Sequence, residues 1–499
     1  MSPSLLQYLV LCIAFFLFVQ LFDKHLTGIS TLLLFWSVIE AVWGILQACG
    51  YGGVSHHMHY IIIGSFGNPG PYGALIAVGM TLAATIAWRQ YHKFDPSRKA
   101  LYYLSLATLL LGFVVLPASR SRAAWIGLTI AIIVLLFHEA NLSIIIRRQR
   151  LAAVGFTVFL LFVGVGVFLM KKDSAIGRFH IWNMESRVIA EHPWTGVGFG
   201  KIYKAYGDEQ SLYFQDAERP AAIVRVAGSP THAYNEYLKF GMAWGIGGVL
   251  LAISVAVIAI WRLFRKNSPL AYGAIVYAIF AFASFPLSVV QLKVLGTVLL
   301  AAALVPEKAG HSWILWLVVG LICCACAVES IKAYPQEKAR RRAERVWKSS
   351  PYLKQEVYDL SVSRLQPLYP RLKDNYKYLF DYGYSLHKSG DYEESNRVLQ
   401  QGADISCDPI FHTIIAKNYI ALQQFDEAEA ELLKAHWLIP CRIYPLWILM
   451  RLYADLGKEA DAINMGRIIK DMPVYKRNPN MAALYSEAMG LLNQLEMRR

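Results

Sequence analysis

Long apolar runs alternate with short polar stretches over the first two thirds of the chain. As helices, these runs would be long enough, or nearly so, to cross a hydrocarbon layer of about 30 Å. They cover residues 5–22, 29–50, 69–88, 101–117, 123–138, 152–170, 236–261, 268–287, 291–305 and 312–331. The ninth run is short, so a tilted or re-entrant helix is an alternative there. The pattern predicts an all-α fold, with a polytopic transmembrane bundle of about ten helices over residues 1–331.

After residue 331, charged, aromatic and small residues alternate, which is typical of a soluble helical domain. The sequence of this part repeats with a period of 33 residues. Tyr392 aligns with Phe425 and Lys458, and Gly383 aligns with Ala416 and Leu449. The order of small residue, turn, aromatic residue and closing Pro resembles the tetratricopeptide repeat, a helix pair that stacks to leave a concave face. We expect such a domain over 374–499, after a basic helical connector over 332–373. A helical domain without a groove ligand is the alternative.

Composition agrees with a membrane class, and charge then gives the orientation. The 499 residues are 56% hydrophobic and 17% charged, with a mean hydropathy of +0.37. The net charge of +14 collects in one set of short loops, which explains it without a nucleic-acid partner. Twelve basic residues fall there, namely Lys24, Arg89, Lys93, Arg98, Lys99, Arg147, Arg148, Arg150, Arg262, Arg265, Lys266 and Lys308, against Arg120 and Arg122 opposite.

Basic loops stay in the cytoplasm. The long segment 171–231 and the C-terminal domain are therefore predicted to lie on the far side, in the periplasm of a bacterium, with the bundle in the inner (cytoplasmic) membrane.

Two arginines on the predicted outer side are the first candidates for chemistry. Arg120 and Arg122 stand between the fourth and fifth apolar runs, against the charge rule. A guanidinium at the membrane boundary is energetically unfavourable unless it pairs with an anion. Its planar set of N–H donors can bind two oxygens of a phosphate at once. Anchoring of the helix ends by snorkelling is the alternative.

The segment 171–231 holds a second group. A predicted amphipathic helix from Arg178 to Glu191 places Arg178 and Trp182 on one face, four residues apart, with Arg187 further along. The glycines at 196, 198 and 200 follow. They lack the strand and helix of a dinucleotide site and predict a tight loop against the membrane.

Two further ionisable residues are candidates. His232 precedes the 236–261 run, and a histidine suits a general base because it titrates near neutral pH. Glu40 lies inside the second run, where an ionisable group is a functional candidate by default. For both residues, a hydrogen-bonded structural role is the alternative.

Residues 60–260 resemble the O-antigen ligase/polymerase superfamily of bacterial membrane glycosyltransferases. The resemblance rests on Ser121-Arg122-Ala123, on Arg178-x-x-x-Trp182 with the later Glu191-His192-Pro193-Trp194 and glycines, and on Asn235-Glu236-Tyr237-Leu238. Family members usually show His-Asn or a close variant, followed by nine residues, Gly, two residues and Gly. Asn235, Gly245 and Gly248 keep that spacing, but Tyr234 occupies the histidine position and His232 stands two residues earlier. Either residue is a candidate for the catalytic acid or base.

The resemblance implies transfer of a glycan from undecaprenyl pyrophosphate to an acceptor hydroxyl on lipid A-core of lipopolysaccharide, a polysaccharide or a protein. Arg122 and Arg178 would bind the pyrophosphate, with Arg120 and Arg187 as further candidates, and Trp182, Asn235 and Glu40 as supporting residues. The chain has no Asp-rich metal motif, so we expect neither a cofactor nor a divalent cation.

The membrane lipid and a protein partner or acceptor at the repeats are the other expected contacts. The alternatives are a transporter or flippase of lipid-linked glycan, and a non-catalytic envelope scaffold acting through the repeats.

Overall fold

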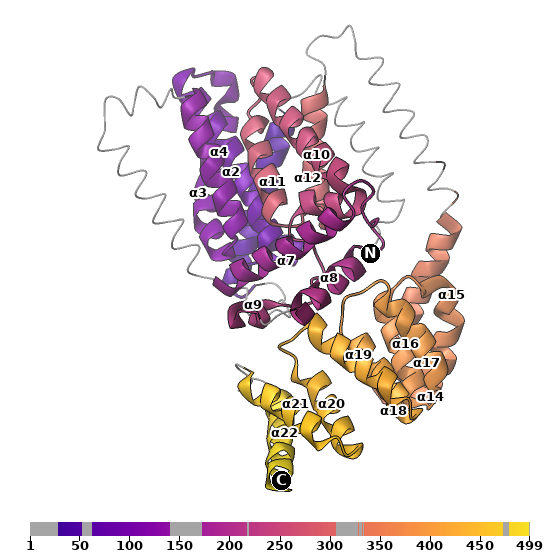
Figure 1. Cartoon of the computed structure of the whole chain (residues 1–499). Coiled ribbons are helices and arrows are strands. Elements are labelled where there is room, and N and C mark those ends of the chain that lie inside the picture. The colour runs from indigo at the N-terminus through magenta and orange to yellow at the C-terminus, as the bar shows by residue number, and fades with distance from the viewer. Residues whose placement is uncertain are drawn as a thin grey trace.

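A computed structural model describes residues 28–51, 62–139, 172–216, 219–305, 328, 332, 334–472 and 479–498, which contain helices and no strand. The apolar helices form one bundle, and the C-terminal helices form a second body beneath it (Figure 1). The bundle consists of Gly28–Ala48, α2 (Pro69–His92), α3 (Lys99–Ser119), α4 (Arg122–Glu139), α10 (Glu236–Arg265), α11 (Leu270–Ala283) and α12 (Val290–Leu304).

The central helix of this bundle is α2, which packs against α3, α4 and α11. Its inward positions carry small residues, and close neighbours fill the space beside them; a Cβ added to Gly79 would lie 2.1 Å from Ser37 Oγ. In contrast, α3 and α10 carry exposed apolar side chains such as Phe113 and Leu250. Apolar faces of this kind suit a surrounding of lipid rather than water.

Five described helices are long and apolar enough to cross a membrane, and α11 and α12 are shorter apolar helices. The predicted runs 5–22 and 152–170, and 312–331 apart from residue 328, lie outside the described residues. The run predicted over 268–287 is wrong at its end, because α11 stops at Ala283. Pro286 lacks a backbone N–H and disfavours helical geometry in the residue before it. Phe285 accordingly has φ −128° and ψ 57°.

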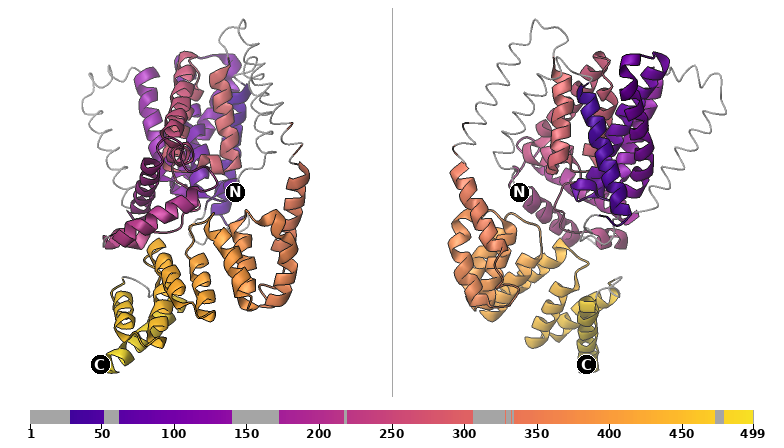
Figure 2. Two further views of the ribbon diagram at one scale, coloured as in Figure 1. Left: turned by 45° about the vertical axis from the view of Figure 1, so that its right-hand side comes forward. Right: turned by 180° about the vertical axis from the view of Figure 1, so that it is seen from behind.

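The 171–231 segment is more ordered than the single amphipathic helix that the sequence predicts. It forms α7 (Lys172–Glu191), α8 (Ile202–Asp216) and α9 (Ala221–Val226). These three helices, called the cap here, lie across one end of the bundle, on the side of the C-terminal body (Figure 2). The cap and the bundle join mainly where α7 packs against α10.

A break inside α10 fixes the glycine loop of the cap. At Trp244 and Gly245 the backbone leaves helical geometry, and Gly245 has φ 69° and ψ −160°. The released groups bond to the loop: Val197 N donates to Met242 O (2.7 Å), and Ile246 N donates to Pro193 O (2.7 Å). A Cβ on Gly245 would lie 2.2 Å from Pro193 O. The glycines thus permit two backbones to meet at the end of the bundle.

The C-terminal body is built from antiparallel helix pairs, as the 33-residue period predicts. The pairs are α16 (Tyr376–Lys388) with α17 (Tyr392–Ala403), α18 (Ile410–Ala421) with α19 (Phe425–Leu438), and α20 (Ile443–Asp455) with α21 (Glu459–Asp471), and α22 (Pro479–Arg498) follows. A helix over residues 334–348, α14 (Tyr358–Leu365) and α15 (Tyr369–Leu372) precede them. The assignment to the tetratricopeptide family stays a prediction.

Part of the predicted connector belongs to the packed core of this body. Trp347 and Leu372 are buried together with Tyr378 of α16. Trp347 Nε1 also donates a hydrogen bond to Asp381 Oδ2 at 2.9 Å. The residues before 374 therefore cover the first helix pair and do not only link it to the membrane part.

Replacing Gly245 by Ala should loosen the cap, because its backbone conformation is almost restricted to glycine and costs about 1–3 kcal/mol in other residues. The added Cβ would also meet Pro193 O. We expect a lower melting temperature and faster proteolysis of the 193–200 loop. Gly247→Ala is the matched control, since a Cβ there meets nothing within 4 Å. Equal behaviour of the two variants would contradict the role assigned to the break.

Candidate anion-binding site between the bundle and the cap

A cavity of about 360 Å³ lies between the bundle and the cap. First-turn residues of two helices line it, Gly70 of α2 and Ala123 of α4, and so does Ser174 of α7. Its far wall is the segment after α11, with Ser284 and Phe285. The N-terminal end of a helix carries partial positive charge, so the starts of α2 and α4 at one cavity favour an anion.

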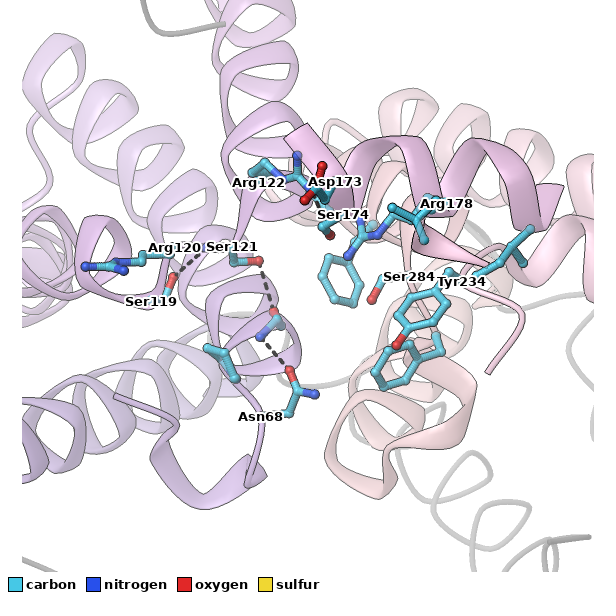
Figure 3. A pocket seen from close by; sticks show the side chains of 18 residues that line it. Asn68, Ser119, Arg120, Ser121, Arg122, Asp173, Ser174, Arg178, Tyr234 and Ser284 are labelled. Carbon is cyan, nitrogen blue, oxygen red and sulfur yellow. Dashed lines mark hydrogen bonds between the residues drawn. The ribbon is translucent and has the colours of Figure 1, made fainter. Parts of the chain in front are cut away.

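Arg122 enters the cavity as the first residue of α4, as Figure 3 shows. Its Nη2 donates to Ser174 Oγ on α7 at 2.9 Å. Ser121, just before it, donates from its hydroxyl to Gly70 O of α2 at 3.2 Å. These bonds help to hold the guanidinium and the start of α4 at the cavity.

Arg178 enters from the opposite side, on α7 (Figure 3). Its Nη1 donates to Ala283 O at 2.7 Å. That carbonyl lies in the last turn of α11 and has no later helical N–H to accept from, because the helix ends there. The guanidinium also lies over the ring of Tyr234, 5.3 Å from its centroid. The early end of α11 thereby provides the acceptor that holds Arg178 at the cavity.

Tyr234 lines the same cavity, in the segment 227–235 that links α9 to α10. It has a positive φ of 54°, which few non-glycine residues adopt. Two neighbours fix it there: Trp182 Nε1 donates to Tyr234 O at 3.4 Å, and the Asn235 side chain accepts from Tyr237 N and Leu238 N as the cap of α10. Trp182 and Asn235 therefore support Tyr234 and do not line the cavity themselves.

His232 is placed one layer behind the cavity wall. Its ring stacks on that of Phe285, with 4.1 Å between centroids and 18° between planes. Burial, helped by Lys239, lowers the pKa of His232 from 6.5 to about 4. The imidazole is therefore neutral at physiological pH, and it contacts Phe285 without lining the cavity itself.

Three other predicted site residues have different surroundings. Arg120 is exposed and, although it borders the cavity, its side chain points away from Arg122 and Arg178 (Figure 3). Arg187 lies outside the cavity, paired with Glu209 of α8 at 3.3 Å. Glu40 is buried within the bundle and accepts from Ser65 N (3.0 Å) and Ser65 Oγ (2.5 Å). It holds the turn before α2, which is the structural alternative for this residue.

The sequence reasoning missed several cavity residues. Asp173 lines the cavity and pairs with Arg225 of α9 at 2.5 Å, so its negative charge is offset. Asn68, another cavity residue, caps α2 by accepting from Gly70 N. Phe285 is a third such residue. Pro286 could have indicated it, since a proline inside an apolar run predicts that the helix ends before it.

The depressed pKa of His232 predicts a loss of stability in acid. Between about pH 6.5 and pH 4 the unfolded chain binds a proton at this residue that the folded chain does not, so unfolding becomes easier as the pH falls. His232→Phe should retain the stacking on Phe285 and show a smaller drop in melting temperature between pH 7 and pH 5. Identical pH dependence in both proteins would contradict the buried, neutral state.

A comparison with known proteins identifies the part of the chain that holds these residues. Residues 106–253 match the model of the O-antigen ligase family. No curated protein matches the chain. The matched range includes Arg122, Arg178 and Tyr234, and it ends just beyond the break in α10. The match and the apolar helices support the O-antigen ligase family, and with it a glycan-transferring, multi-pass membrane enzyme.

Proposed function

We propose that the cavity binds the pyrophosphate of an undecaprenyl-pyrophosphate-linked glycan and that the chain transfers this glycan to an acceptor hydroxyl. The observation that carries the proposal is the convergence of Arg122 and Arg178 from two helices on one cavity lined by helix starts. Guanidinium groups bind phosphate oxygens through paired, charge-assisted hydrogen bonds. The exposed apolar faces of α3 and α10 suit contact with a membrane, in which the undecaprenyl tail of the donor would remain during the reaction.

In the proposed reaction the acceptor oxygen forms a bond to the anomeric carbon while the bond from that carbon to the pyrophosphate oxygen breaks. The leaving pyrophosphate takes the electron pair, and Arg122 and Arg178 stabilise its developing charge. The acceptor proton passes to a base. Tyr234, as a phenolate, is our first choice for that base, because it lines the cavity beside the Arg178 guanidinium. His232 does not line the cavity. His232 remains the alternative if the segment 227–235 shifts when substrate binds.

We place the reaction at the periplasmic face of the inner membrane. The site and the cap lie at one end of the bundle (Figure 1). At the other end, Arg89 of α2 bonds with Glu139 of α4 and with Asn267 after α10. Basic residues cluster at that second end, and the charge rule assigns it to the cytoplasm.

We also propose that the C-terminal helix pairs contact the acceptor or a partner protein. Their first helices carry rings beside cations: Lys388 lies 5.7 Å from the ring centroid of Tyr384, Lys417 4.9 Å from Tyr444, and Arg451 5.1 Å from Trp447. Aromatic and cationic side chains of this kind are common at binding surfaces. Whether the acceptor is lipid A-core, polysaccharide or protein is left to the transfer assay.

Binding of the donor tests the arginine assignment. Arg178→Ala should weaken binding of the lipid-linked glycan to the protein in nanodiscs by about 10- to 100-fold, since a hydrogen bond to a charged group contributes roughly 1.5–3 kcal/mol. Arg178→Lys should retain part of the affinity because it keeps the charge. Arg187→Gln, on the same helix but outside the cavity, serves as the control and should bind within about twofold of the native chain. Equal losses at both positions would refute the site.

Transfer from donor to candidate acceptors tests the base and separates an enzyme from a transporter or scaffold. Tyr234→Phe should reduce kcat by about 100-fold or more, as loss of a general base does, while donor binding persists. A decrease in His232→Ala alone would assign the base to the histidine. Full transfer by both variants would exclude both residues as the base, and no transfer by the native chain with any acceptor would favour the transporter or scaffold.

A further inference from the structure

Gln210, in the middle of α8, is buried, with 1% of its surface exposed. Its Nε2 donates to the carbonyl oxygens of Gly228 (3.1 Å) and Leu438. Its Oε1 accepts from Tyr206 Oη (2.6 Å) and from His180 Nε2 (2.9 Å). Carbonyl oxygens only accept hydrogen bonds, so these four bonds fix the orientation of the amide. They occupy both of its N–H donors and both lone pairs of its oxygen.

These partners come from parts of the chain with different tasks. His180 is on α7, between Arg178 and Trp182. Gly228 begins the segment that leads to Tyr234, and Leu438 is the last residue of α19 in the C-terminal body. One buried amide thus joins that body to α7, which carries Arg178, and to the segment 227–235, which carries Tyr234.

Further contacts make α8 the joint between the cap and the C-terminal body. Gly207 faces the body so closely that an added Cβ would lie 2.6 Å from Cys407 Cβ. Lys204 Nζ lies 3.9 Å from Asp404 Oδ1. On the other side, Tyr203 Oη donates to Thr231 O at 2.7 Å, within the segment 227–235. Displacement of the body from α8 would therefore act directly on that segment.

We propose that Gln210 is a positioning residue, through which docking of the C-terminal body on α8 holds Tyr234 in place at the cavity. The body is then part of the catalytic machinery in addition to any role in binding an acceptor. The activity arm of this inference rests on the proposed function. Its structural arm does not, since the order of segment 227–235 can be measured without turnover.

The test compares the full-length chain in nanodiscs with Gln210→Leu, which loses all four hydrogen bonds. We expect faster deuterium exchange of the 227–235 amides and a decrease in kcat of about tenfold or more, because small misplacement of a reacting group is costly. Donor KM should change less than twofold, since Arg122 is held by other contacts. Gln215→Leu makes the same chemical change at an exposed position of α8 and should match the native chain.

A second variant guards against simple misfolding of the first. Gly207→Ala should press the C-terminal body away at Cys407 while leaving Gln210 itself intact; Gly200→Ala is its control, since a Cβ there meets nothing within 4 Å. Faster exchange at 227–235 in both Gln210→Leu and Gly207→Ala supports the coupling, even if the native chain transfers no glycan and the proposed function fails. Native exchange in both variants, or a change in donor KM with unchanged kcat, would overturn it.

Discussion

The site depends on backbone polar groups that two interrupted apolar helices leave without helical partners. In a hydrocarbon environment every N–H and C=O must be paired within the protein. At the end of α11, Ala283 O accepts a hydrogen bond from Arg178 Nη1. At the break in α10, Met242 O accepts a hydrogen bond from Val197 N. In both places the cap supplies the missing partner, so the requirement to pair backbone groups also attaches the cap to the bundle.

That attachment explains how positive charge is held at the edge of a membrane. Arg122 belongs to the bundle and Arg178 to the cap, and each is oriented by a neutral oxygen, Ser174 Oγ or Ala283 O. The helix starts of α2 and α4 add partial charges of the same sign. A doubly charged group such as a pyrophosphate suits this arrangement better than a neutral sugar does.

The sequence predicted many of the apolar helices and the nearness of Arg122 and Arg178, and what it did not predict has physical causes. Apolar runs and the charge rule are local signals, so the helices and the position of Arg122 followed from them. Arg187 lies outside the cavity, because nine residues after Arg178 correspond to half a turn beyond two full turns and so place the two on opposite faces of α7. The cap helices α8 and α9 and the four bonds of Gln210 depend on contacts far apart in the chain, which residue spacing does not reveal.

The central claim is that Arg122 and Arg178 hold the donor pyrophosphate between the bundle and the cap. An experimental structure of the protein in a lipid nanodisc, with an undecaprenyl-pyrophosphate-linked glycan bound, tests it most directly. The account predicts both phosphates within hydrogen-bonding reach of these guanidiniums, with the first sugar towards Tyr234. A pyrophosphate bound elsewhere, for example beside Arg89 at the opposite end of the bundle, would contradict it.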